Sequence, residues 1–348
     1  MYRMVLQSLL DRLLHKIVWR DSVTEPIRTF VLNTVTNGTA SAPYLATKCL
    51  QRLADEGKDS HPAAAKVLRK DFYVDDMLSG VDDIEEGKVL IKEMIELLQS
   101  AGFLLRKWNS NSKELLSEVP EDLRDERSIL ELDSSSSSVK TLGLPPSTDS
   151  FRFSSPMWNE STEITKRCVL SDASRLFDPL ELVRPVITQA KIFLQDLWKQ
   201  DCGWDDPLEL QLQEYWREYR RNLASLDGIS VPRWIAISRI VVAVELHGFC
   251  DASNKAYGAC VYVRTTAIDG SVAVHLLTSK SRVAPLENLK KNKKSFSTPR
   301  LELSSALLLA HLYEKIVNSI NVTAKCFFFW ADSTIVICWL SSSPSRWK

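Results

Sequence analysis

The clearest alternation of hydrophobic and polar positions lies in the last third of the chain. Apolar, β-branched and aromatic runs predict strands at 240–249, 257–264 and 272–277, with the turn Asp251–Asn254 after the first. Pro299 then opens a long Leu/Ala-rich helix, since proline suits the first helical turn. We expect a buried strand at 324–330 and a second helix from Ser333. This order predicts a three-stranded meander followed by a helical crossover to a fourth, parallel strand.

Two regions precede this one. Residues 1–130 end near a charged run at 121–127, and serines 134–138 have so little apolar surface to bury that they predict a linker. Residues 131–238 begin with the strand-like segment 151–153. They become helical at 186–198, where apolar residues recur every three to four positions. The sequence therefore predicts an α/β (α+β) fold with regions 1–130, 131–238 and 239–348.

Composition limits the class of protein. The 348 residues are 45% hydrophobic and 25% charged, and 44 basic residues balance 44 acidic ones. Neutrality gives no bulk attraction to nucleic acid, although a local basic groove can still bind it. The seven cysteines form no Cys-x-x-Cys pair and no two histidines have ligand spacing, which argues against a zinc site or a disulfide framework. Without a signal peptide or an apolar run of about 20 residues, we expect an intracellular, cytoplasmic or nuclear protein with no membrane partner.

The sharpest local motif is the adjacent pair Asp75 and Asp76. Aromatic and β-branched residues before the pair and apolar residues after it predict a β-hairpin with both carboxylates at its tip. Adjacent like charges are stabilised by a cation, commonly a divalent metal. Two such ions can activate a 3′-hydroxyl and stabilise a leaving pyrophosphate. An Asp-Asp pair alone is more often a solvated turn, which is our interpretation of Asp82 and Asp83.

Three separate carboxylates predict a second site. Asp251 ends the first strand of the last region, Glu302 lies in the first turns of the long helix, and Asp332 follows the fourth strand. Groups at the carboxyl ends of parallel strands face a common crevice. Together with the glutamate they can hold two metal ions that activate water against an RNA phosphodiester. Singly, each is more often a cap or a surface charge, and Glu302 also suits a helix N-terminus.

Several segments resemble the pol proteins of BEL/Pao-type long-terminal-repeat retrotransposons, and the resemblance covers nearly all of the chain. Tyr73-Val74-Asp75-Asp76 resembles the catalytic hairpin of reverse transcriptases. Residues 32–43 resemble the segment that shapes the nucleotide and template pocket, 102–108 the segment that holds the primer end, and 170–180 the entry to the thumb and connection. The Asp–Glu–Asp order is similar to RNase H. The resemblance implies a partial reverse transcriptase palm and thumb, a connection region and an incomplete RNase H-like domain.

The same resemblance implies two active sites, each with two Mg²⁺ or Mn²⁺ ions. Asp75 and Asp76 would be the catalytic metal ligands of a polymerase, and Asp251, Glu302 and Asp332 those of a nuclease. The implied partners are a template–primer, an RNA–DNA hybrid, and the protease and integrase segments of a polyprotein. The residues implied to contact nucleotide or nucleic acid are Gly38, Ser41, Pro43, Tyr73, Val74, Arg106, Lys107, Trp108, Ser253, Lys280 and Arg282.

The family pattern is incomplete in this sequence. A further polymerase aspartate would precede Met1 and a last RNase H carboxylate would follow Lys348, so we expect no polymerase activity and weak or no nuclease activity from this chain alone. Glu181 also stands where the family favours glycine. Whether the chain is an enzyme therefore stays open at this point.

Two alternatives to a catalytic role follow from the residues. A non-catalytic nucleic-acid-binding relic or host-adopted scaffold would keep basic residues such as Arg106, Lys107 and the lysines at 290–294 while tolerating the loss of carboxylates. An aspartic peptidase is not expected, although this region of the family is also labelled a Pao retrotransposon peptidase. The reason is that the sequence contains no Asp-Thr-Gly or Asp-Ser-Gly.

Overall fold

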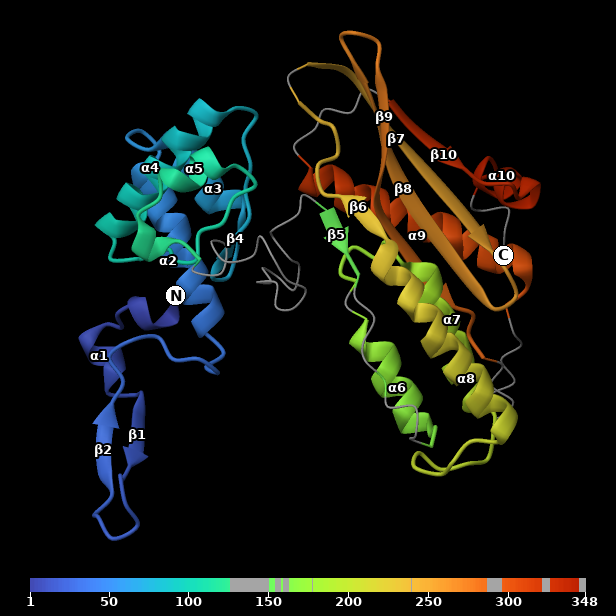
Figure 1. Ribbon diagram of the computed structural model, residues 1–348, viewed down its shortest axis with the longest axis horizontal. Coiled ribbons are helices and arrows are strands. Elements are labelled where there is room, and N and C mark those ends of the chain that lie inside the picture. Colours follow the sequence, from blue (N-terminus) through green and yellow to red (C-terminus); the bar gives the residue numbers. More distant parts are fainter. Residues whose placement is uncertain are drawn as a thin grey trace. The chain divides into compact units, whose positions relative to one another are not determined.

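The computed structural model describes residues 1–125, 150–153, 158, 163–176, 178–238, 240–286, 296–320 and 326–343. The chain divides into two compact units, Met1–Thr148 and Asp149–Lys348. Both contain helices and strands (Figure 1), which confirms the α/β class. The division into three regions stays a prediction. Serines 134–138 and lysines 290–294 lie outside the described residues.

The first unit is built on three packed helices: α2 (Ala42–Gly57), α3 (Pro62–Lys70) and α4 (Ile84–Ser100). Their apolar faces bury Leu50, Leu68 and Met94 in one core. Asp83 caps α4 by accepting a hydrogen bond from the backbone N–H of Glu86 at 2.8 Å, which agrees with an exposed structural role for this aspartate. The other elements are η1 (Tyr2–Met4), α1 (Leu9–Arg12), β1 (Lys16–Trp19), β2 (Arg28–Val31), β3 (Phe72–Tyr73), β4 (Asp76–Met77), α5 (Lys113–Ser117) and η2 (Glu121–Leu123).

A mixed sheet is the centre of the second unit, and its described strands have the order β10-β7-β8-β9. These strands are β7 (Val241–Ala252), β8 (Ala256–Ala267), β9 (Val272–Val283) and β10 (Cys326–Trp330). The first three form an antiparallel meander, and β10 pairs in parallel with β7. Helix α9 (Thr298–Ser319) makes the crossover and buries Leu308, Leu309 and Leu312 against one face of the sheet (Figure 1). The predicted meander, crossover and parallel pairing are confirmed.

Strand β10 is not the buried strand that the sequence predicts. All five of its residues are exposed, and Phe329 keeps 56% of its surface. The reason is that β10 lies at the edge of the described sheet, where β7 covers one side only. Its rings pack on both faces: Phe327 meets Tyr313 of α9 at 4.9 Å between ring centroids, and Phe328 stacks on His247 at 4.9 Å. The apolar run marks a strand but does not distinguish an edge from a centre.

The helical part of the second unit comprises α6 (Lys166–Arg175), α7 (Arg184–Leu197) and α8 (Leu210–Asn222). Its core centres on Trp216, which is fully buried between Phe193 and Tyr219 with ring centroids 5.2 and 4.6 Å away. The helix predicted at 186–198 is α7, and the strand predicted at 151–153 is β5 (Ser150–Arg152). The remaining elements are η4 (Leu223–Gly228), β6 (Ser230–Pro232) and α10 (Thr334–Leu340). In the part of the chain that the structure describes, no helix has the length and apolarity to cross a membrane.

A buried ion pair joins α6 to α8. Arg220 Nη2 lies 2.7 Å from Asp172 Oδ2, and the two side chains are only 8% and 5% exposed. The same carboxylate oxygen accepts a hydrogen bond from Trp216 Nε1 at 2.8 Å. Arg220 also lies over the ring of Trp158. Each charge is therefore stabilised by the other, because neither side chain is solvated by bulk water.

We expect Asp172→Ala to destabilise the second unit by about 3–5 kcal/mol, since Arg220 would remain buried without a counter-charge. The matched control is Asp205→Ala, which breaks the solvent-exposed pair with Arg167 and should change stability little. Urea denaturation followed by tryptophan fluorescence measures both. Equal losses in the two variants would contradict a special role for the buried pair.

Candidate nuclease and polymerase sites

A hollow of about 870 Å³ lies at the carboxyl ends of β7 and β10, and both Asp251 and Asp332 line it. The strand register explains this meeting. Phe249 of β7 lies beside Trp330 of the parallel strand β10, so the residues two positions further on lie at the same edge of the sheet. Asp251 is still part of β7, paired with Gly258, so the turn begins later than the sequence predicts. The structure thus brings two of the three predicted nuclease carboxylates together.

Glu302 occupies the first turns of α9 but does not line the hollow. Its Oε2 accepts a hydrogen bond from the hydroxyl of Ser333 at 2.5 Å. The Ser333 hydroxyl also caps α10 by accepting from the backbone N–H of Val336 at 3.3 Å. The third carboxylate is therefore tied to the residue that follows Asp332. The sequence reasoning missed this bond, although a serine directly after the aspartate and before a helix is a signal for a cap.

The donor chemistry at this edge fits a divalent cation, because carboxylate oxygens are the ligands that Mg²⁺ prefers. The number of assembled donors does not fit a two-metal site. Among the described residues, no three His, Cys, Asp or Glu side chains are grouped so that they could hold a metal ion. Asp251 and Asp332 share the hollow, whereas Glu302 is engaged with Ser333. The Mg²⁺ or Mn²⁺ ions therefore stay a prediction.

The pKa of the Cys250 thiol depends on the charges of both aspartates. Burial raises the pKa of Cys250, and the nearby carboxylates of Asp251 and Asp332 raise it further, while a hydrogen bond with Ser305 lowers it. Its Sγ lies 3.6 Å from the carbonyl oxygen of Trp330. Both aspartates therefore lie close enough to the Cys250 thiol to disfavour its ionisation.

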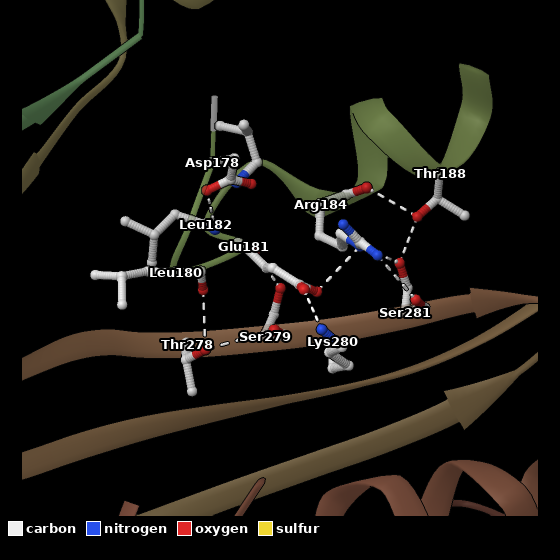
Figure 2. Close-up of polar contacts among 11 residues, drawn as sticks. Asp178, Leu180, Glu181, Leu182, Arg184, Thr188, Thr278, Ser279, Lys280 and Ser281 are labelled. Atoms are coloured by element: carbon white, nitrogen blue, oxygen red, sulfur yellow. Dashed lines mark hydrogen bonds and ion pairs between the residues drawn. The ribbon is translucent and has the colours of Figure 1, made fainter. Parts of the chain in front are cut away.

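The other wall of the hollow is basic and hydroxylic. It includes Arg184 and Thr188 of α7 together with Lys280 and Ser281 of β9. Figure 2 shows Ser281 linked to Arg184 and Thr188, while Lys280 is linked to Glu181. Lys280 is one of the predicted nucleic-acid contacts. Arg184 and Thr188 were missed, because neither belongs to a local motif and their approach to β9 depends on how α7 docks.

The remaining predicted nuclease contacts separate in the structure. Ser253 lines the hollow, and its hydroxyl also holds the β7–β8 turn by accepting from the backbone N–H groups of Lys255 and Ala256 at 3.2 Å each. Arg282 is exposed on β9 and is not part of the lining. Of this predicted set, Ser253 and Lys280 therefore share the hollow with Asp251 and Asp332.

The predicted hairpin at Asp75 and Asp76 is present in the first unit as β3 and β4. Tyr73 pairs with Asp76, which leaves Val74 and Asp75 in the turn. Val74 has φ = 58°, a conformation that a β-branched residue rarely adopts. Tyr73 and both aspartates are exposed. The hairpin is closed at its base, where Asp71 accepts a hydrogen bond from Ser79 Oγ at 2.6 Å.

The other predicted polymerase contacts flank the helices of the first unit. Gly38 has φ = 89° in the loop before α2, Ser41 precedes that helix and Pro43 lies in its first turn. Arg106 and Lys107 are exposed after α4. Trp108 is different, because its ring packs on the core and its Nε1 donates to the carbonyl of Leu105 at 3.1 Å. A role for the Trp108 ring in stacking on a base is therefore less favoured than the sequence suggests.

Residues 165–333 match the family model described as a Pao retrotransposon-like RNaseH-like domain. The second unit therefore resembles the RNaseH-like domain of Pao-type retrotransposons. The match covers the helical part of the second unit, the sheet and all three nuclease carboxylates, and it confirms the family resemblance found in the sequence. No curated protein matches the chain.

Two solved structures are remotely similar to this chain. One is the foamy viral protease-reverse transcriptase dRH in complex with double-stranded DNA, with 14% identity and a TM-score of 0.46. The other is the foamy viral protease-reverse transcriptase in complex with double-stranded DNA, with 14% identity and a TM-score of 0.45. Each similarity covers 98% of this chain, which spans 51% and 61% of the lengths of the two structures.

We expect Ser333→Ala to lower the free energy of unfolding by about 1 kcal/mol, because α10 loses its N-terminal cap. The conservative variant Ser333→Thr keeps the hydroxyl and should stay close to the parent protein. Chemical denaturation of the three proteins measures the difference. An unchanged midpoint in Ser333→Ala would mean that the cap and its bond to Glu302 contribute nothing to stability.

Proposed function

We propose that the second unit cleaves the RNA strand of an RNA–DNA hybrid by hydrolysis, with Asp251, Glu302 and Asp332 as its catalytic carboxylates. The observation that carries this proposal is the hollow in which Asp251 and Asp332 meet at one sheet edge while Arg184 and Lys280 line another part of the wall. The match of residues 165–333 to a retrotransposon RNaseH-like family model supports the same role.

The charge distribution in the hollow suits a nucleic-acid strand. Cationic side chains attract the phosphate backbone, and hydroxyl groups can donate to its oxygens. Asp251 and Asp332 would hold a divalent cation, and Glu302 would join them on leaving Ser333. A bound cation of this kind supplies an activated water and stabilises charge on a phosphate. The aspartates would hold and orient that group, and the basic side chains would position the strand.

For the first unit we propose the metal-binding hairpin of an RNA-directed DNA polymerase. Asp75 and Asp76 are adjacent and exposed at a turn whose first residue, Val74, has a strained backbone. Such strain is often found where a side chain must be held for function. In this proposal the template–primer is the partner of the unit, and protease and integrase segments are partners of the longer polyprotein. Mg²⁺ or Mn²⁺ would be the cofactor.

A second candidate function is metal-independent binding of nucleic acid without catalysis. The hydrogen bond between Glu302 and Ser333 favours it, as does the lack of a three-carboxylate group among the described residues. Binding of a hybrid that falls steeply with salt but does not depend on a divalent cation would distinguish this role from catalysis.

The deciding measurement is cleavage of a labelled RNA–DNA hybrid by the purified chain in Mn²⁺ or Mg²⁺. We expect weak, metal-dependent cleavage of the RNA strand that is lost in Asp251→Asn and in Asp332→Asn, because each change removes a carboxylate charge from the hollow. Glu245→Gln is the matched control, since Glu245 also lies on β7 but pairs with Arg264 and does not line the hollow.

Cleavage that survives in both aspartate variants would contradict the proposed site. Hybrid binding with no cleavage in any metal would instead support the non-catalytic candidate. Fluorescence anisotropy with the same hybrid, with and without Mn²⁺, provides that comparison.

A further inference from the structure

Glu181 has an unusual backbone conformation at the corner where the helical part of the second unit meets the sheet. Its φ is 58°, in the left-handed region that favours glycine, and its side chain is only 12% exposed. A long side chain in this conformation is unfavourable, because its Cβ atom approaches a carbonyl oxygen too closely. Glu181 therefore occupies a backbone conformation that is unfavourable for a residue with a side chain.

Hydrogen bonds from both sides hold this corner in place (Figure 2). The carbonyl of Leu180 accepts from Thr278 Oγ1 at 2.9 Å, and the carbonyl of Glu181 accepts from the Ser279 hydroxyl. On the helix side, Asp178 accepts from the backbone N–H groups of Leu182 and Val183 at 2.8 and 3.0 Å. These backbone contacts do not use the Glu181 carboxylate, so the corner is held without it.

The carboxylate of Glu181 instead engages two cations of the hollow. Lys280 Nζ donates to its Oε1. Its Oε2 lies 3.1 Å from Arg184 Nε in an ion pair, yet this buried oxygen accepts no hydrogen bond from any described residue. Arg184 and Lys280 line the hollow, whereas Glu181 is not part of the lining. The carboxylate thus contacts the two cations from outside the lining of the hollow. One of its oxygens lacks a hydrogen-bond donor in the described part of the chain.

Cationic charge exceeds anionic charge around this corner. Burial lowers the pKa of Lys191, and the neighbouring charges of Arg184 and Lys280 lower it further, whereas Glu181 raises it. Burial raises the pKa of Asp178, a second carboxyl group here, and Glu181 also raises it, whereas the backbone hydrogen bonds from Leu182 and Val183 and the charge of Arg184 lower it. Three basic groups therefore face two acidic ones, and α7 adds the positive end of its dipole because it begins at Arg184.

We propose that Arg184 and Lys280, together with the hydroxyls of Thr188 and Ser281, form a phosphate-binding site in the wall of the hollow, and that Glu181 occupies its cations as an internal competitor. The donor set is already assembled. Arg184 Nε donates to Ser281 Oγ at 3.2 Å, and the hydroxyls of Thr188 and Ser281 are hydrogen-bonded to each other. The ligand is a phosphate oxyanion, and its assignment to a nucleic-acid strand rests on the proposed function.

Two substitutions separate the charge of Glu181 from its conformation. Glu181→Gly removes the carboxylate and also relieves the left-handed backbone, so the variant should fold. Glu181→Gln removes the charge while keeping the side-chain length and the backbone strain. Thermal denaturation establishes that both are folded before binding is compared.

The first arm measures anisotropy of a labelled RNA–DNA hybrid between 50 and 200 mM KCl without divalent cations. We expect Glu181→Gly to bind about 5–10-fold more tightly at low salt, with the slope of log K against log salt steeper by about 1–2, as one or two added phosphate contacts require. Glu181→Gln should change in the same direction. Adding Lys280→Ala to Glu181→Gly should abolish the gain.

Glu214→Gln is the matched control for this arm. Glu214 also pairs with two basic residues, Arg217 and Arg221, but it is exposed on α8 and outside the hollow. The substitution changes the net charge by the same amount and should leave hybrid affinity unchanged. An equal gain in Glu214→Gln would show that net charge alone is responsible, which would overturn the proposal.

The second arm uses sodium tripolyphosphate and isothermal titration calorimetry. Gain of tripolyphosphate binding in Glu181→Gly, with no hybrid binding by any variant, would support the phosphate site and refute the proposed nucleic-acid function. Gain with both probes supports both proposals. If the parent protein binds hybrid and neither Glu181 variant gains affinity for either probe, the phosphate site is refuted and the proposed function survives. No binding of either probe by any variant refutes both.

Discussion

The parallel pairing of β10 with β7 decides where the carboxylates of the second unit meet, because parallel strands end at the same edge of a sheet. The pairing requires a crossover, and α9 supplies it against the face formed by β7 and β8. Close approach of that helix depends on Gly248, where a Cβ atom would lie 2.6 Å from Leu309 Cδ1. An antiparallel β10 would have carried Asp332 to the far end of the sheet from Asp251. The parallel pairing of β10 with β7 therefore determines the crossover, the packing of α9 and the position of the candidate site.

The docking of α7 against β9 supplies the other wall of the hollow. Arg184 is central to it, because its guanidinium contacts Ser281 of β9 while its backbone begins the helix. The hollow is thus lined by a sheet edge that carries two aspartates and by a helix start that carries Arg184. Opposite charges on the walls of one hollow allow a protein with no net charge to attract a polyanion locally.

Local patterns predicted most of the framework. The meander, the crossover and the helix that became α7 follow from periodicity, and the hairpin at Asp75 and Asp76 follows from apolar segments around a polar turn. The meeting of Asp251 with Asp332 followed from the strand order. The bonds of Glu302 to Ser333 and of Glu181 to Lys280 could not be predicted, since they join residues 31 and 99 positions apart. Such contacts depend on side-chain direction after packing, on which periodicity gives no information. The exposure of β10 was missed for a related reason, because hydrophobicity alone does not identify an edge.

Each wall of the hollow is linked to a carboxylate that already has a hydrogen-bond donor within the protein. Glu302 accepts from Ser333 beside the aspartates, and Glu181 holds Lys280 and Arg184 on the basic side. A hydrogen bond to a charged group contributes about 1.5–3 kcal/mol, which is small beside the interaction of a carboxylate with a divalent cation. Ligand binding at the proposed sites would therefore be an exchange of partners. A cation would have to compete with the Ser333 hydroxyl for Glu302, and a phosphate would have to compete with Glu181 for its two cations. The affinity of the hollow for such ligands would then depend on these internal contacts as well as on the groups that line it.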